Sequence, residues 1–285
     1  MSDHPHPDPT PGRPEIGATI DAGGLATNYL EAAPEGGAGS TVVLVHGSGP
    51  GVSAYANWRL TIPALATQHR VLAPDMAGFG FSARPDTYGM ATWTRQLLGF
   101  ADALELDRFS LVGNSFGGGL AIAFAAAHPD RVERLVLMGS VGVSFPITDG
   151  LDRVWGYEPS IEHMKALLDL FAYDRSLVTD ELAEVRHRAS TEPGVHEAFA
   201  AMFPAPRQRW VEDMATPEDV IRTLPHETLI VHGRDDRVIP LDNALRLLAL
   251  IERAQLHVFG RCGHWTQIEH ARRFNALLLD FLGER

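Results

Sequence analysis

One stretch decides how this 285-residue chain is interpreted: Leu111-Val112-Gly113-Asn114-Ser115-Phe116-Gly117-Gly118-Gly119. It consists of an apolar strand that runs into a turn of the form G-x-S-x-G, followed by an alanine-rich helix expected over residues 120–127. Gly113 and Gly117 leave the space that a strained strand-to-helix corner needs, so that Ser115 stands exposed at its tip. The pattern predicts a nucleophile elbow. The alternative is a buried turn in which the serine only caps a helix.

Length and composition fit one large α/β domain with an insertion, and a hydrophobic fraction of 45% is enough for a sizeable core. The formal net charge of −12 argues against nucleic acid or an anionic membrane as partner. No apolar run approaches the roughly 20 residues that cross a bilayer, and the N-terminus does not resemble a signal peptide. We therefore expect a cytoplasmic protein, with residues 1–14, which are rich in proline, as a disordered tail.

A single cysteine, Cys262, excludes an internal disulfide and a thiolate metal cage, and it suits a reducing compartment. Cys262 stands two residues before His264, so a catalytic thiol is one interpretation. A small apolar residue of the core is the favoured one, because the elbow already offers a nucleophile. The sequence indicates neither a metal ion nor an organic cofactor.

Short apolar runs separated by helical patterns predict a mostly parallel sheet that is covered by helices on both faces. Besides the strand that enters the elbow, strands are expected at residues 16–20, 27–32, 41–45, 70–75, 134–138, 228–231 and 255–259. Helices are expected at residues 58–66, 91–104, 161–173, 180–189, 195–202 and 266–282. The alternation of predicted strands and helices is interrupted between the two parts of the core, residues 15–140 and 214–285. We expect residues 141–213 to be a helical lid over the strand ends, where open α/β sheets bind ligands.

A serine hydroxyl needs a base beside it, and the base needs an acid that orients it. Asp235 and Asp236 follow one predicted strand, and His264 follows the next one. The order serine, acid, histidine is the order found in α/β-hydrolases. We favour Asp236 over Asp235, because the acid of this fold commonly stands three residues after a glycine and four before a proline, here Gly233 and Pro240.

Each of these residues also has a structural interpretation. The two aspartates can belong to a solvated charged loop, in which Asp235 pairs with an arginine, and His264 can be a structural histidine. Three matches in the right order at three predicted strand ends favour a catalytic triad of Ser115, Asp236 and His264.

Attack by the serine creates an oxyanion, which preorganised N–H groups stabilise. The backbone N–H of Phe116 is one candidate donor, and Ser48, in the glycine-rich turn at residues 46–51, is the other. That turn could instead be flexible or cradle a phosphate. No G-K-[ST] follows it, so a P-loop is excluded.

The chain resembles the meta-cleavage product hydrolases of aromatic-compound degradation, and most of all those acting on single-ring products, the 2-hydroxymuconic semialdehyde hydrolases. The resemblance spans about residues 17–282. It is carried by the sequences at residues 46–54, 56–58, 113–119, 144–148 and 262–267, of which SFPIT and CGHWTQ are the most specific.

This resemblance implies that the chain hydrolyses a carbon–carbon bond in a 2-hydroxy-6-oxohexa-2,4-dienoate, giving 2-hydroxypenta-2,4-dienoate and a small carboxylic acid. Enzymes of this family first ketonise the dienol and then cleave it, with water, the serine and the histidine implicated. Asn57, Asn114, Arg186 and Trp265 match the positions that hold the dienoate. The resemblance also implies a homo-oligomer, a dimer or a higher assembly.

The residue types suit that substrate. Arg186 can grip a carboxylate through a bidentate fork, with Arg188 as the rival on the same predicted helix. Asn57 and Asn114 can hydrogen-bond the oxo and enol oxygens, or merely satisfy backbone amides. Trp265 offers a flat wall and one N–H donor, or plain packing.

The lid region also contains apolar side chains that could shape the pocket for the departing acyl group or simply pack in the core: Phe145, Trp155, Phe199, Met202, Phe203 and Trp210.

Two other functions fit the same scaffold. One is an ester or enol-lactone hydrolase with the same triad, and the other is a protein that binds a small molecule without turnover, since a fold does not fix a function. Haloalkane dehalogenase and epoxide hydrolase chemistry are disfavoured, because the families that perform them have aspartate where Ser115 stands.

Overall fold

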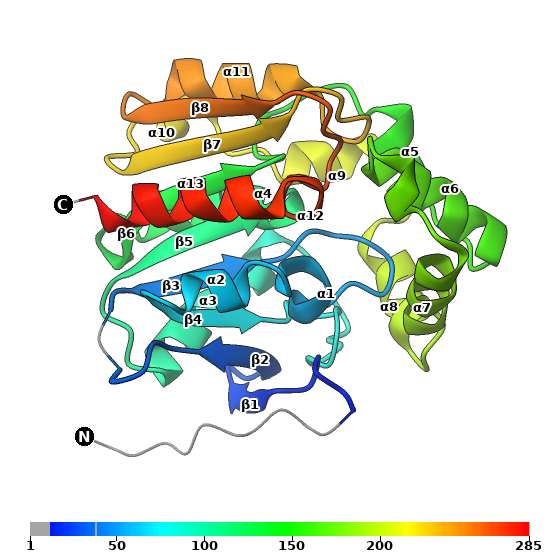
Figure 1. Ribbon diagram of the computed structural model, residues 1–285, viewed down its shortest axis with the longest axis horizontal. Coiled ribbons are helices and arrows are strands. Elements are labelled where there is room, and N and C mark those ends of the chain that lie inside the picture. Colours follow the sequence, from blue (N-terminus) through cyan, green and yellow to red (C-terminus); the bar gives the residue numbers. More distant parts are fainter. Residues whose placement is uncertain (1–11, 38, 285) are drawn as a thin grey trace.

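A twisted sheet of eight strands forms the centre of the part of the chain that the computed structural model describes, residues 12–37 and 39–284 (Figure 1). The strands are β1 (Ala18–Asp21), β2 (Ala26–Ala32), β3 (Thr41–Val45), β4 (Arg70–Pro74), β5 (Phe109–Asn114), β6 (Val132–Met138), β7 (Glu227–Gly233) and β8 (Ala254–Phe259). Their order in space is β1-β2-β4-β3-β5-β6-β7-β8. The two pairings that involve β2 are antiparallel, and the strands from β4 to β8 run parallel.

The middle strands are continuous apolar runs because both of their faces are covered, as is usual for parallel sheets. Every residue of β5 is buried. On one face the core contains Trp93, Leu97 and Phe100 of α3 (Met90–Ala103) and most of α4 (Phe116–Ala127), while α11 (Leu241–Leu250) adds Leu247.

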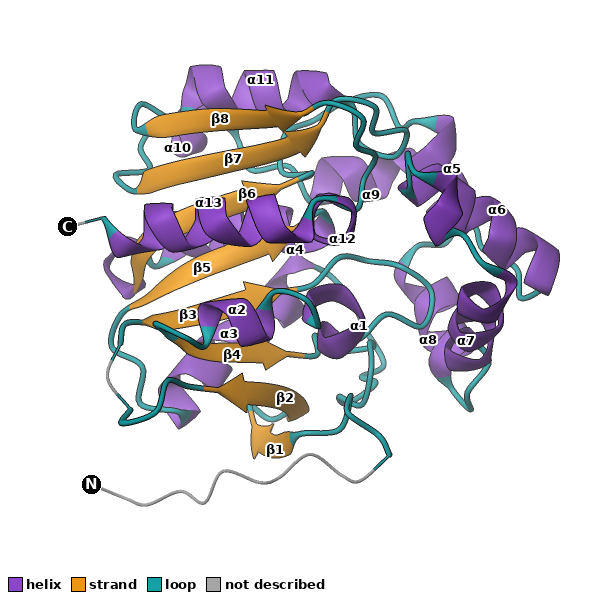
Figure 2. Cartoon of the chain, in the orientation of Figure 1, coloured by secondary structure: helices purple, strands orange, loops and turns teal. Residues whose placement is uncertain are grey.

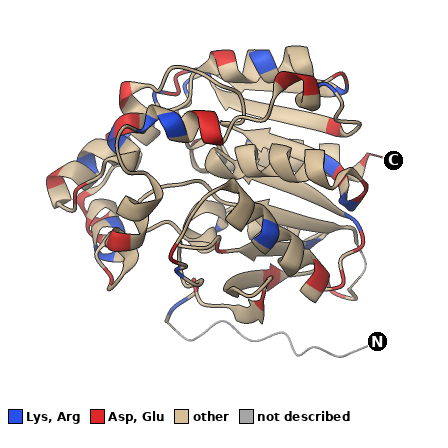
Figure 3. Cartoon of the chain, turned by 180° about the vertical axis from the view of Figure 1, so that it is seen from behind, with Lys and Arg blue, Asp and Glu red and all other residues tan. Residues whose placement is uncertain are grey.

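The opposite face of the sheet is covered by α1 (Ala54–Trp58), α2 (Ile62–Leu65) and α13 (Ala271–Gly283). Trp58, Phe274 and Phe281 are the largest side chains of this second core. Figure 2 shows the sheet between these two helical layers. The charged residues lie mainly on the helices and loops (Figure 3). The predicted class, a mostly parallel α/β sheet with helices on both faces, is therefore confirmed.

An inserted helical region follows β6 and lies beyond the carboxyl ends of the strands (Figure 1). Its helices are α5 (Asp149–Trp155), α6 (Ile161–Phe171), α7 (Asp180–Ser190), α8 (Val195–Met202) and α9 (Gln208–Asp213). The sequence predicts α6, α7 and α8 but misses α5 and α9, and it also misses α10 (Glu218–Ile221) and α11 in the core. Single turns of 3-10 helix occur at Pro129–Arg131 and Arg175–Leu177.

Three predicted helices have wrong boundaries. The helix expected at residues 58–66 is two short helices, because Pro63 occupies the first turn of α2 and cannot continue a helix from α1. The helix expected at residues 266–282 breaks at His270, which has a non-helical φ of −122° and separates α12 (Thr266–Glu269) from α13. The elbow helix begins at Phe116, four residues before the expected start, because the turn is completed at Ser115 itself.

In the described part of the chain no helix is long and apolar enough to cross a bilayer. The predicted tail, residues 1–14, lies largely outside the described residues. The boundaries predicted for the two core parts and the lid stay a prediction.

Candidate active site

Ser115 occupies the sharp corner between β5 and α4, with φ 54° and ψ −112°. A positive φ is strained for a residue with a side chain, and such strain is typical of functional turns. The corner requires its flanking glycines, because a Cβ on Gly113 would collide with the Gly117 carbonyl and one on Gly117 with the carbonyl of Val45. The predicted elbow is therefore present, and its hydroxyl faces a cavity.

His264 and Asp236 form a short hydrogen bond, 2.7 Å from imidazole Nδ1 to carboxylate Oδ2. The second carboxylate oxygen of Asp236 accepts the N–H groups of Val238 at 2.7 Å and Ile239 at 3.0 Å. Burial raises the pKa of Asp236, but the His264 imidazole, the neighbouring His232 ring and the hydrogen bond from the Val238 N–H together hold that pKa below its ordinary value. The acid is thus an ionised group that fixes the orientation of the ring.

Asp235, the rival acid, does not approach the imidazole. Its carboxylate lies 3.4 Å from the Arg234 guanidinium, as expected for a pair in a partly solvated loop. The structure therefore brings Asp236, and not its neighbour, to His264.

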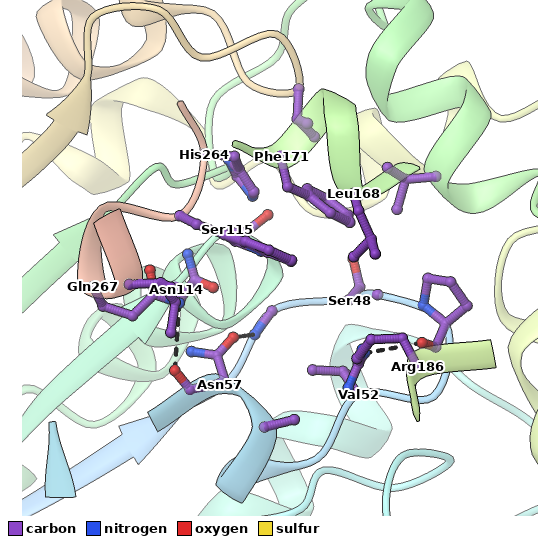
Figure 4. Close-up of a pocket in the computed structure, with 18 of the residues that line it drawn as sticks. Ser48, Val52, Asn57, Asn114, Ser115, Leu168, Phe171, Arg186, His264 and Gln267 are labelled. Atoms are coloured by element: carbon purple, nitrogen blue, oxygen red, sulfur yellow. Dashed lines mark hydrogen bonds between the residues drawn. The ribbon is translucent and has the colours of Figure 1, made fainter. Parts of the chain in front are cut away.

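Ser115 and His264 line the same cavity (Figure 4). Among the hydrogen bonds of the described residues, none joins these two side chains. Catalytic hydrogen bonds are often long in the absence of substrate and tighten when it binds. The arrangement can therefore activate the serine once its hydroxyl turns toward the ring.

The two predicted oxyanion donors flank the elbow. Phe116 is the first residue of α4, and within the described residues neither its N–H nor that of Ser48 has a hydrogen-bond partner. A Cβ on Gly47 would lie 3.4 Å from Ser115 Cβ, so the turn that contains Ser48 passes directly beside the nucleophile. Two amides without partners in the described structure, one on each of the two turns that meet at Ser115, are the kind of donors from which an oxyanion hole is built.

His46 fixes the start of that turn. Its Nε2 accepts the N–H of Met76 at 2.9 Å, so Nδ1 carries the proton that is donated to the Gly47 carbonyl at 2.8 Å. Burial lowers the pKa of His46 to about 4. The ring is therefore a neutral structural group.

The residues predicted to hold substrate, Asn57, Asn114, Arg186 and Trp265, all line the cavity, which encloses about 150 Å³ of free volume. Figure 4 shows the first three of them. Asn57 accepts the Gly47 N–H at 3.2 Å through its amide oxygen, which leaves its amide nitrogen buried without a partner in the described structure. Asn114 donates to the Met138 carbonyl at 3.2 Å.

Arg186 donates to the Pro50 carbonyl at 3.0 Å, whereas its rival Arg188 is exposed and outside the cavity. Trp265 stacks on Phe171, with ring centroids 5.2 Å apart.

Two lining residues, Gln267 and Arg59, were not singled out as substrate-binding residues in the sequence. Gln267 donates to the Asn57 carbonyl at 3.4 Å, and its own amide oxygen is buried without a partner among the described residues. The feature of the sequence that points to Arg59 is its position directly after the Ala56-Asn57-Trp58 segment.

The side chains of the inserted region that were considered for the pocket do not line the cavity. Trp155 and Phe203 stack face to face at 4.6 Å, and of all the aromatic side chains in the described inserted helices only Phe171 reaches the cavity. The apolar wall instead contains Leu151, Val154, Met164, Leu168, Leu177 and Leu182. Cys262 is buried, which raises the pKa of its thiol to about 12, so it is not a nucleophile. No metal-binding cluster of His, Cys, Asp and Glu occurs in residues 12–37 and 39–284.

The chain belongs to the alpha/beta hydrolase fold family, whose model matches residues 40–271, and within it to the meta-cleavage product hydrolases. It is 61% identical over 273 residues to the 2-hydroxymuconate semialdehyde hydrolase of Pseudomonas sp. strain CF600, covering 95% of each chain. It is 63% identical over 270 residues to the 2-hydroxy-6-oxo-2,4-heptadienoate hydrolase of Pseudomonas putida, covering 94% of this chain and 96% of the other.

Among solved structures, a serine-to-alanine variant of the meta-cleavage product hydrolase of Pseudomonas fluorescens IP01, complexed with acetates, superposes with a TM-score of 0.91. The two sequences are 59% identical, and the match covers 94% of this chain and 97% of that one. The family that the sequence motifs predict is therefore confirmed.

Proposed function

We propose that this chain hydrolyses the C5–C6 bond of 2-hydroxymuconic semialdehyde or a close 2-hydroxy-6-oxohexa-2,4-dienoate. One observation carries the proposal. A single cavity contains the Ser115 hydroxyl, the imidazole that Asp236 orients, and an arginine from the inserted helices, and its described lining includes no Asp or Glu. Such a cavity suits an anionic substrate with a reactive carbonyl.

In the proposed binding mode Arg186 holds the carboxylate, while Asn57 and Asn114 hydrogen-bond the oxygen on C2. The unpartnered amide nitrogen of Asn57 supports this role, because a buried N–H without an acceptor costs free energy until a ligand provides one. Trp265 provides the flat wall against which the conjugated chain lies.

The proposed reaction begins with ketonisation, in which the dienol loses its O–H proton and C5 gains one. His264 then takes a proton from the attacking group, either Ser115 or a water beside it, as that group adds to C6. The N–H groups of Ser48 and Phe116 hold the oxyanion that forms on the C6 oxygen. When the C5–C6 bond breaks, its electron pair moves through the conjugated chain to the C2 oxygen, which takes the proton held by His264, giving 2-hydroxypenta-2,4-dienoate. If water attacked, the other product is the carboxylic acid directly. If Ser115 attacked, the acyl group remains as an ester on Ser115 until a water, deprotonated by His264, hydrolyses it to the carboxylic acid.

A spectrophotometric assay tests the function. The purified chain is mixed with 2-hydroxymuconic semialdehyde and, separately, with a panel of p-nitrophenyl esters and an enol-lactone. We expect the yellow dienol absorbance to disappear with release of formate. Turnover of esters or lactone alone would assign simple acyl-transfer chemistry instead, and binding of the dienoate without turnover would make the chain a binding protein.

Three further proposals concern the inserted helices, the cellular compartment and the oligomeric state. Helices α5 to α9 act as a lid, which their position beyond the strand ends supports. The chain works in the cytoplasm, which its single buried cysteine supports. It assembles as a homo-oligomer, which rests on the resemblance to the family alone.

A further inference from the structure

Two arginines, and not one, line the cavity. Arg186 comes from α7, and Arg59 directly follows α1. Each is held by one hydrogen bond to a backbone carbonyl: Arg186 to Pro50 at 3.0 Å, and Arg59 to Ala56 at 2.7 Å. Pro50 and Ala56 line the cavity as well, so both arginines are fixed at its wall.

Neither arginine has an acidic partner in the described residues, although many other arginines of the chain do, among them Arg70 with Glu31 at 2.7 Å. A guanidinium has five N–H donors, and the hydrogen bond to the backbone uses one of them. The remaining donors of Arg59 and Arg186 are available to a ligand.

The two positive charges also affect one another. Burial, and after it the charge of Arg59, lowers the pKa of Arg186 to about 10. Like charges held at one half-buried wall cost free energy unless an anion joins them. The cavity thus has a strongly cationic wall in a protein whose formal net charge is −12.

We propose that Arg59 is a second substrate-binding residue, which together with Arg186 holds the substrate carboxylate between two guanidinium groups. This inference rests on the proposed function. The carboxylate keeps its charge throughout bond cleavage, so its contacts are equally strong in the ground state and the transition state. Loss of Arg59 should therefore raise KM and leave kcat almost unchanged.

A second consequence concerns capture of the substrate. The negative protein repels an anion at long range, and the two arginines reverse the potential at the cavity. Removing one of them should weaken the dependence of kcat/KM on salt concentration, because this attraction is screened.

The competing role for Arg59 is structural, as a side chain that caps the end of α1 through the Ala56 carbonyl. Three variants separate the two roles. Arg59→Met removes both the charge and the donor, Arg59→Gln keeps a donor but no charge, and Arg59→Lys keeps the charge. Arg188→Met, an exposed arginine of α7, is the matched control.

The experiment measures steady-state kinetics with 2-hydroxymuconic semialdehyde at low and high NaCl, together with thermal unfolding. We expect Arg59→Met and Arg59→Gln each to raise KM about tenfold, with kcat within about twofold and a flatter salt dependence. Arg59→Lys should keep the salt dependence of the wild type, and Arg188→Met should match the wild type throughout. With the methyl ester of the substrate carboxylate, the KM of the wild type and of Arg59→Gln should be equal.

An unchanged KM of Arg59→Gln for the substrate would overturn the proposal. The proposal would also be overturned if Arg59→Gln raised the KM for the methyl ester as much as the KM for the substrate. If Arg59→Met does not fold, Arg59→Gln and Arg59→Lys still decide, because each keeps a donor to the Ala56 carbonyl. A wild-type chain that does not cleave the dienoate would refute the proposed function itself. A wild type that cleaves it, with Arg59→Gln unaltered, would refute the role of Arg59 alone.

Discussion

The indole N–H of Trp155 donates a hydrogen bond to the hydroxyl of Ser48 at 2.9 Å. This bond joins α5 of the inserted region to the turn that contains a proposed oxyanion donor. Both side chains are buried, and the Trp155 ring is held by its stack on Phe203. The inserted helices therefore help to fix the position of Ser48.

Replacing Trp155 tests this coupling. Trp155→Phe removes the N–H and keeps an aromatic ring on Phe203, so we expect kcat to fall about fivefold, equivalent to one neutral hydrogen bond of about 1 kcal/mol. Trp210→Phe is the control, because it removes an indole hydrogen bond to Pro204 outside the site. Equal kinetics of the two variants would show that the Trp155 bond does not influence the reaction.

The proposed nucleophile and base should act as a unit. Ser115→Ala and His264→Ala are each expected to lower kcat by roughly 10⁴-fold or more, and the double variant by little more than either single one. In single-turnover experiments, loss of the dienol absorbance measures the ketonisation step and release of the carboxylic acid measures the cleavage step. Undiminished turnover in either variant would contradict the assignment.

The two adjacent aspartates allow a matched comparison. Asp236→Asn removes the carboxylate that orients His264, and we expect a loss of kcat of about 10³-fold to 10⁴-fold, as in other triads. Asp235→Asn changes the neighbouring residue, whose carboxylate pairs with Arg234, and should retain kcat within about twofold. The reverse order of effects would assign the acid to Asp235.

His46 should make stability depend on pH. Its pKa is about 4 in the folded chain and 6.5 when unfolded, so the unfolded state binds the extra proton between these values. The contribution of His46 to the free energy of unfolding is therefore at its maximum above pH 6.5. It decreases as the pH falls toward 4, by about 3 kcal/mol in all.

Urea unfolding at pH 7, 5.5 and 4.5 measures this dependence. The gap in stability between the wild type and His46→Gln should narrow steadily as the pH falls, whereas His163→Gln, a change of an exposed histidine, should follow the wild type at every pH. A constant gap would mean that the ring is not neutral in the folded state.

Much of the fold could be predicted from local sequence. The central strands are continuous apolar runs, and the elbow has its two glycines, so both were located correctly. Helix α5 was missed because its seven residues are too few to show a clear period. The break at His270 was missed because it lies inside an unbroken helical pattern, and the contact of its ring with Phe259 at the end of β8 is not visible in the sequence.

The residues of the candidate site that belong to a sequence motif lie together in the structure, as the sequence predicts, while their roles stay predictions. Ser115, His264 and the favoured Asp236 lie where their order along the chain predicts, and Asn57, Asn114, Arg186 and Trp265 meet at one cavity. Which residues of the inserted helices reach that cavity was not predictable, because an amphipathic pattern indicates that a side chain is buried but not against which partner it packs. Trp155 and Phe203 pack together, while Leu168 and Leu182 face the cavity.

The proposed catalytic residues and the apolar wall of the cavity come from different stretches of the chain. Ser115, Asp236 and His264 follow β5, β7 and β8, whereas the apolar wall comes mostly from α5, α6 and α7. Substitutions in the apolar wall of the inserted segment can therefore alter which ring-fission product is accepted without changing the three residues that are proposed to break the bond. Related enzymes can therefore come to accept different aromatic ring-fission products through changes confined to one inserted segment.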